Sequence, residues 1–191
     1  QIDHTRLLPG DLLLYATHPD GGKKLIASGI RLFQRKDYGF DDARWHHVGM
    51  YVQGHVIVEA VRQKGVVVSP VDARFADHLV RVRRLRLSKG EYRKLGHLMS
   101  DRAKSLCGTP YDIRDVAWQS ADLPRNAHQG YVCSTLYIDV LEWAIDTLGE
   151  RAPQLWDTVS RLRLLTKRGV VQLPALLSHS ANFDDVAVGW L

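Results

Sequence analysis

The stretch Tyr131–Leu148, YVCSTLYIDVLEWAIDTL, is the segment around which we expect the chain to fold. Its apolar residues recur at steps of three and four, which places them on one face of a helix of about five turns. These residues are Cys133, Leu136, Tyr137, Val140, Leu141, Ala144, Ile145 and Leu148. Gly149 follows, where a left-handed C-terminal cap is expected. The spacing therefore predicts a helix with one buried face.

Cys133 would lie in the first turn of this helix, because the preceding Ala127–Gly130 reads as a loop. Unpaired backbone N–H groups and the positive end of the helix dipole favour a thiolate at that position. The same residue also begins the apolar stripe, and unreactive cysteines are common in protein cores. The helix alone leaves both interpretations open, nucleophile or core residue.

The composition is that of an ordinary globular protein, with 45% hydrophobic and 25% charged residues in 191. We expect residues 1–191 to form a single catalytic domain, with 152–191 as a C-terminal extension packed on it. No apolar run reaches the roughly 18 residues of a membrane span. Cys107 and Cys133 are too few for a disulfide framework or a four-cysteine metal site. The net charge of +5 favours anionic partners such as nucleic acid, lipid headgroups or bacterial wall polymers.

The remaining pattern predicts strands followed by helices. Short apolar runs bounded by Gly, Pro and polar turns indicate strands at Leu7–Tyr15, Val48–Val52, Val56–Val61, Gly65–Val71 and Val80–Leu87. Ser88 and Glu91 form a capping box for a helix to about Leu106. Further expected elements are helices at Lys24–Gln34, Ile113–Arg125 and Trp156–Leu165, a strand at Val170–Leu173 and a last short helix from Pro174. This order predicts an α+β fold with an antiparallel sheet packed against the cysteine-bearing helix.

His47 and Glu59 are the candidate partners of a reactive cysteine, one on each arm of the hairpin Val48–Val61. A cysteine nucleophile needs a base and a third group that orients the base. Glu59 lies between Val58 and Ala60, where a carboxylate is costly unless it is paired. The two residues share a face only if the hairpin has an odd loop or a bulge, which places Glu59 opposite Gly49.

Other interpretations of this hairpin are available. His47 could be a surface residue, and Glu59 could pair with an arginine of the Val80–Leu87 strand. A zinc site from His46, His47, His55 and Glu59 is less favoured, because adjacent histidines on a strand point to opposite faces.

Several short motifs, taken in order, resemble the NlpC superfamily of papain-fold cysteine peptidases. His47-Val-Gly-Met-Tyr followed by Val56-Ile-Val-Glu-Ala is similar to the family's histidine hairpin. Pro9-Gly-Asp-Leu12 resembles its entry strand, Gly108-Thr-Pro-Tyr111 its G-x-x-Y turn, and Tyr131-Val-Cys-Ser-Thr135 the start of its nucleophile helix. His47 precedes Cys133, as in the circularly permuted branch of YiiX- and YaeF-like proteins, related to lecithin-retinol acyltransferase-like enzymes. The resemblance spans about residues 7–180.

The resemblance implies a circularly permuted papain-like fold with Cys133 as nucleophile, His47 as base, Glu59 as orienting group and Tyr111 near the oxyanion. Two positions depart from the family pattern: the usual D-C-S is V-C-S here, and the third residue is Glu where His, Asn or Gln is common. Both departures leave the substrate open.

The expected activity is acyl transfer through a thioester, without metal or cofactor. A peptide amide of the bacterial cell wall is the first substrate class, since wall peptidases dominate the superfamily. A lipid or fatty-acyl ester is the second, and an exported toxin acting on a rival's wall is also compatible. A third reading is a non-catalytic anion-binding module that uses Arg81, Arg83, Arg84 and Arg86, which otherwise read as a solvated strand face. We expect a monomer without nucleic-acid partners, in the periplasm, secreted or exported to the cell envelope.

Overall fold

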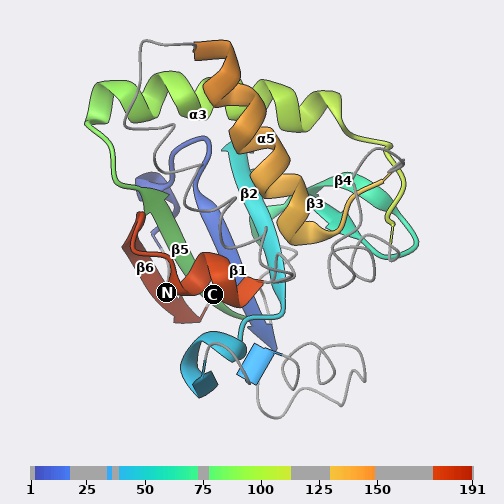
Figure 1. Ribbon diagram of the computed structural model, residues 1–191, viewed down its shortest axis with the longest axis vertical. Coiled ribbons are helices and arrows are strands. Elements are labelled where there is room, and N and C mark those ends of the chain that lie inside the picture. The colour runs from blue at the N-terminus through green and yellow to red at the C-terminus, as the bar shows by residue number, and fades with distance from the viewer. Residues whose placement is uncertain are drawn as a thin grey trace.

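The protein is built on a six-stranded antiparallel sheet with the strand order β4-β3-β2-β1-β5-β6 (Figure 1). The computed structural model describes residues 3–17, 34–35, 39–72, 78–112, 130–148 and 174–190. The strands are β1 (Leu12–Thr17), β2 (His47–Gln53), β3 (Val56–Val61), β4 (Gly65–Pro70), β5 (His78–Leu85) and β6 (Phe183–Trp190). The α+β class with an antiparallel sheet is therefore as the sequence predicts.

Five of the six strands occur where the sequence predicts them. The main difference is at β1, which begins at Leu12 and not at Leu7. The preceding turn is fixed by Asp11, a fully buried carboxylate that accepts hydrogen bonds from Leu8 N at 2.8 Å and from Arg84 Nε at 2.7 Å. The hydroxyl of Tyr92 also donates to Asp11, at 2.8 Å. This aspartate explains why the chain turns before it enters the sheet.

The helices are η1 (His4–Arg6), α3 (Lys89–Ser105), α5 (Cys133–Leu148) and α7 (Pro174–His179). The predicted capping box of α3 is present: Glu91 N donates to Ser88 Oγ, and Ser88 N donates to the Glu91 carboxylate. The predicted α5 stripe is buried along its length except for Leu148, which is partly exposed. The helix that begins at Pro174 is also confirmed.

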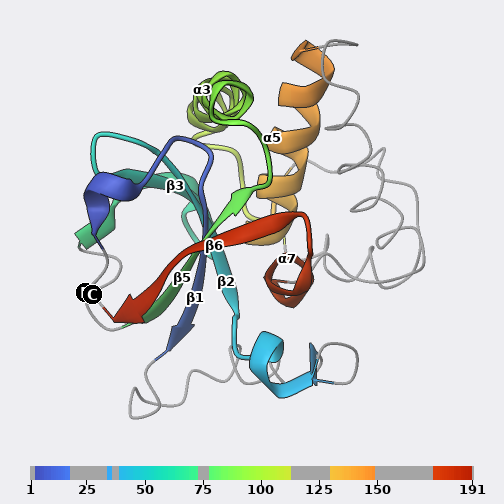
Figure 2. The same ribbon diagram turned by 90° about the vertical axis from the view of Figure 1, so that its left-hand side faces the viewer.

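The core has two parts, one on each face of the sheet. The larger part joins α3, α5 and α7 to alternate strand residues such as Leu12, Met50 and Val58. Figure 2 shows α5 and α7 on the same side of the sheet. The smaller part contains the residues between them, including Leu13, Tyr15 and Ile57. This alternation follows the two-residue period of a strand, and it places α5 against one face only.

Strand β6 is an element that the sequence pattern did not predict. It pairs with β5 and carries Asp184 and Asp185. The pairing shifts register between Val82 and Arg83, so the irregularity expected at Arg83–Arg84 is present. The predicted elements at Ile113–Arg125, Trp156–Leu165 and Val170–Leu173 lie outside the described residues, as do Gly149 and, apart from Gln34, Lys24–Gln34.

Candidate active site

Cys133 is the first residue of α5, as the sequence predicts. The helix start is closed by Leu136 N, which donates to Val132 O at 3.0 Å, and by Val132 N, which donates to Thr135 Oγ1 at 3.1 Å. Cys133 is 8% exposed, and its sulfur receives hydrogen bonds from the backbone N–H groups of Ser134 and Val48. A sulfur that accepts two backbone N–H groups at a helix N-terminus is held in surroundings that suit a thiolate.

The contact between Cys133 and Val48 is possible because β2 and β3 are paired only near their turn. Their pairing runs from Gln53–Val56 to Met50–Val58, whereas β2 continues against β1 as far as His47. Tyr51 N donates to Asp11 O, on the β1 side, and backbone groups alternate along a strand, so Val48 N points toward β3. The start of α5 thus supplies a hydrogen-bond acceptor, the Cys133 sulfur, where the ladder ends.

His47 and Glu59 form the close pair that the hairpin pattern predicts. The Nε2–H of His47 donates to Glu59 Oε2 at 2.6 Å. The register satisfies the parity condition: a bulge lies between Tyr51 and Gln53, and the Met50–Val58 pairing extended by one residue places Glu59 opposite Gly49. The Glu59 side chain is 0% exposed and that of His47 is 17% exposed. A short charge-assisted hydrogen bond in this setting fixes the imidazole.

The imidazole also makes a hydrogen bond to the Cys133 thiol. Since Nε2 is occupied by Glu59, we assign this bond to Nδ1. Burial alone lowers the pKa of His47, but the charges and hydrogen bonds of Cys133 and Glu59 outweigh burial and raise this pKa to about 9. Burial alone would raise the pKa of Cys133, but the His47 imidazolium and the hydrogen bonds at the sulfur lower it. The pair therefore favours a thiolate beside an imidazolium.

Two further residues support the pair, and the sequence analysis did not single out either of them. Tyr15 is the cross-strand partner of His47, and its ring stacks on the imidazole with 5.4 Å between centroids and 28° between planes. Ser69 on β4 donates a hydrogen bond from Oγ to Glu59 Oε1 at 2.7 Å. Their positions could be found from strand parity once the register is known, but neither carries a sequence signature of its own.

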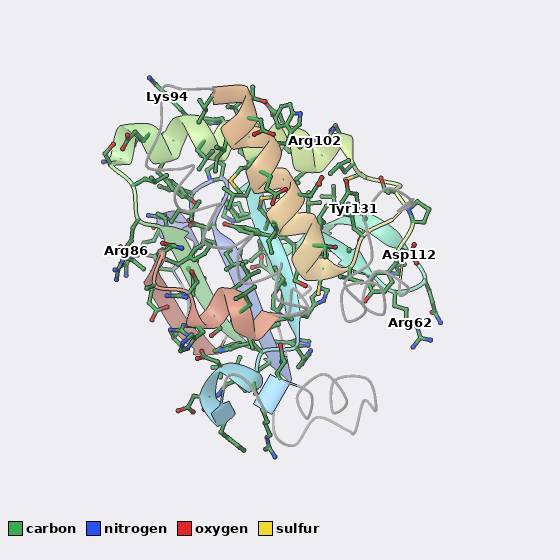
Figure 3. All side chains as sticks on the ribbon, in the orientation of Figure 1. Arg62, Arg86, Lys94, Arg102, Asp112 and Tyr131 are labelled. Atoms are coloured by element: carbon green, nitrogen blue, oxygen red, sulfur yellow. The ribbon has the colours of Figure 1, made fainter. Side chains whose placement is uncertain are left out.

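Tyr111 lies near the start of α5, though through its backbone. It forms an isolated parallel bridge with Tyr131, two residues before Cys133. Asp112 N donates to Tyr131 O at 3.3 Å, and Figure 3 shows Asp112 and Tyr131 near this end of α5. The role expected for the Tyr111 hydroxyl at the oxyanion stays a prediction.

The zinc alternative gains no support from the geometry. Within the described part of the chain, no group of three or more His, Cys, Asp or Glu side chains is arranged to hold a metal ion. Glu59 instead binds His47 and Ser69. Nor does any described helix combine the length and apolarity that a membrane crossing requires.

The four arginines proposed as an anion-binding face already have partners. Arg81 pairs with Asp185, Arg84 with Asp11 and Arg86 with Asp184. Arg83 is 6% exposed and donates to backbone carbonyls at the end of α7. The expectation of a solvated strand face was wrong for these residues, because β6 and α7 bring acidic and carbonyl groups against them.

Comparison of the sequence with models of known protein families and with curated proteins finds no match. The case for a function therefore depends on the geometry of Cys133, His47 and Glu59 and on the motifs of the sequence.

Proposed function

We propose that the protein is a cysteine hydrolase of the circularly permuted NlpC type, with Cys133 as nucleophile, His47 as general base and Glu59 as the group that orients His47. The observation that carries the proposal is the continuous hydrogen-bonded chain from the Cys133 thiol through His47 to Glu59, with 2.6 Å between His47 Nε2 and Glu59 Oε2. Such a chain at the start of a buried helix is the arrangement that activates a thiol for attack on a carbonyl.

The proposed reaction has two steps. The Cys133 thiolate attacks the substrate carbonyl carbon, and His47 gives its proton to the leaving nitrogen, so the C–N bond breaks and a thioester forms. Water then attacks the thioester, His47 takes the proton from that water, and the acid and the free thiolate are released. The Cys133 backbone N–H and the Tyr111 hydroxyl are the proposed donors to the oxyanion, and one such donor is typically worth about 3 kcal/mol.

We propose a peptide amide of the bacterial cell wall as the substrate. The motifs that resemble wall peptidases and the net charge of +5, which suits an anionic polymer, support this choice. A fatty-acyl ester would be cleaved by the same chemistry.

The test is incubation of the purified protein with soluble cell-wall stem peptides and, in parallel, with fatty-acyl esters, followed by mass spectrometry. The wild type should release a new amine from the peptides, and Cys133→Ala should release none. Cys107→Ser is the matched control: Cys107 is exposed, burial of its thiol raises its pKa, and its loss should leave the rate unchanged. Cleavage of esters alone would replace the amide with the lipid substrate, and full activity in Cys133→Ala would refute the thiol mechanism.

A further inference from the structure

The second carboxylate oxygen of Glu59 is held as closely as the first. Oε2 accepts from His47 at 2.6 Å, and Oε1 accepts from Ser69 Oγ at 2.7 Å. Ser69 belongs to β4, where it pairs with Ile57, while Val67 pairs with Glu59. Ser69 and Glu59 are therefore diagonal neighbours on the same face of the sheet, within reach of a side-chain hydrogen bond.

Glu59 has a strong physical requirement for this second donor. Its side chain is 0% exposed. An ionised carboxylate without solvent is stable only when its oxygens are hydrogen-bonded or paired with charge. A hydroxyl donor on Oε1 favours the charged form and fixes the plane of the carboxylate, and this plane aims Oε2 at the imidazole.

We propose that Ser69 is a positioning residue of the active site, which keeps Glu59 ionised and directed at His47. The proposal rests on the proposed function, because it gives Ser69 a role through the same pair. The hydrogen-bonded chain then extends from Cys133 on α5 through β2 and β3 to Ser69 on β4.

Ser69 would act on the thiol only through its neighbours. Without its hydroxyl, the Glu59 carboxylate gives less support to the imidazolium, and the imidazolium gives less support to the thiolate. The titratable groups against the His47–Glu59 pair in the described part of the chain are Cys133 from α5 and Tyr15 from β1. The Cys133 thiolate should consequently form at higher pH when the Ser69 hydroxyl is removed.

The experiment is the rate of Cys133 alkylation by iodoacetamide as a function of pH, followed by intact-protein mass in a Cys107→Ser background. Ser69→Thr and Ser69→Val form the matched pair, since the two side chains have similar shape, both suit a strand, and only threonine keeps the hydroxyl. Ser69→Val should move the acid limb of the profile up by about half to one pH unit, while Ser69→Thr should stay near the wild type.

Ser100→Ala is the control for loss of a buried serine hydrogen bond elsewhere, because Ser100 Oγ donates to Val52 O at 3.1 Å. It should leave the profile unchanged. Identical profiles for Ser69→Thr and Ser69→Val would overturn the role of Ser69 while leaving the proposed function intact. A wild-type profile without reactivity at low pH would instead refute the proposed function itself.

Discussion

At the scale of single residues, the two cysteines of the chain have opposite surroundings. Cys107 is exposed, and the only cause that acts on its thiol is partial burial, which raises its pKa. Cys133 is buried, yet the imidazolium of His47 and the backbone N–H groups of Val48 and Ser134 lower its pKa. Burial disfavours a thiolate, and charge and hydrogen bonds reverse that effect only at Cys133. Selective chemistry at neutral pH should therefore occur at Cys133.

The first prediction concerns the titration of His47. The imidazole should lose its proton at about pH 9 in the wild type, because Cys133 and Glu59 raise its pKa against the effect of burial. Cys133→Ser should lower the midpoint, since the charge of Cys133 is the largest cause that raises it. Glu59→Gln should lower it as well. NMR titration of the ring protons measures each midpoint, and a value near 9 that persists in Cys133→Ser would show that the thiolate does not support the imidazolium.

At the scale of elements, the strands and helices could be predicted because each has a local signal. The hairpin β2–β3 follows from its alternating pattern, and its parity could be narrowed to an odd loop or a bulge. The structure has the bulge, followed by a turn in which Gly54 and His55 both have positive φ. Such a turn matches the twist of an antiparallel pair. The choice between loop and bulge depends on this turn conformation, which the pattern alone did not define.

Strand β6 could not be predicted because its sequence, FDDVAVGW, lacks a clean apolar alternation. Asp184 and Asp185 are accommodated in the strand by Arg86 and Arg81 of the neighbouring segment. That complementarity is visible only when the two strands are known to be adjacent. Ser69 escaped notice for the same reason, since its partner lies on another strand.

The second prediction concerns Gly49, the glycine of the motif His47-Val-Gly-Met-Tyr51. A Cβ at this position would lie 2.5 Å from the Tyr15 hydroxyl, whereas the nearest ring carbons are at 3.3 Å. Gly49→Ala should displace the Tyr15 ring from His47, and so slow Cys133 alkylation at low pH by several-fold. Adding Tyr15→Phe removes the clashing oxygen and should restore much of the lost rate.

The measurement is the alkylation rate at pH 6 for the two single variants and the double variant. A double variant that is slower than Gly49→Ala would contradict a clash with the hydroxyl as the cause. Gly54→Ala serves as a comparison, because a Cβ there meets no atom within 4 Å and its cost comes from the positive φ alone.

At the scale of the whole molecule, Arg83 joins the last elements of the chain to the sheet. Its guanidinium lies on β5 and donates to Leu177 O at 2.9 Å, to Ser180 O at 3.0 Å and to Phe183 O at 2.7 Å. It thereby satisfies carbonyls at the end of α7 and at the start of β6. A buried cation with several acceptors is strongly destabilising to remove, because the acceptors lose their partners.

The third prediction is that Arg83→Met lowers the free energy of unfolding by about 2–4 kcal/mol. Arg86→Met is the matched control on the same segment, since Arg86 is exposed and pairs only with the exposed Asp184 (Figure 3). Its effect should be much smaller, as is usual for a surface ion pair. Urea denaturation of both variants measures the difference, and equal losses of stability would contradict the role given to Arg83.

The central claim is that His47 activates Cys133, and the pH dependence of Cys133 alkylation by iodoacetamide tests it most directly. The wild type should react well below pH ~8.5, the ordinary pKa of a free thiol, and His47→Ala should lose this reactivity at low pH. A Cys133 that reacts only after the protein is denatured would be a core residue and would contradict the account.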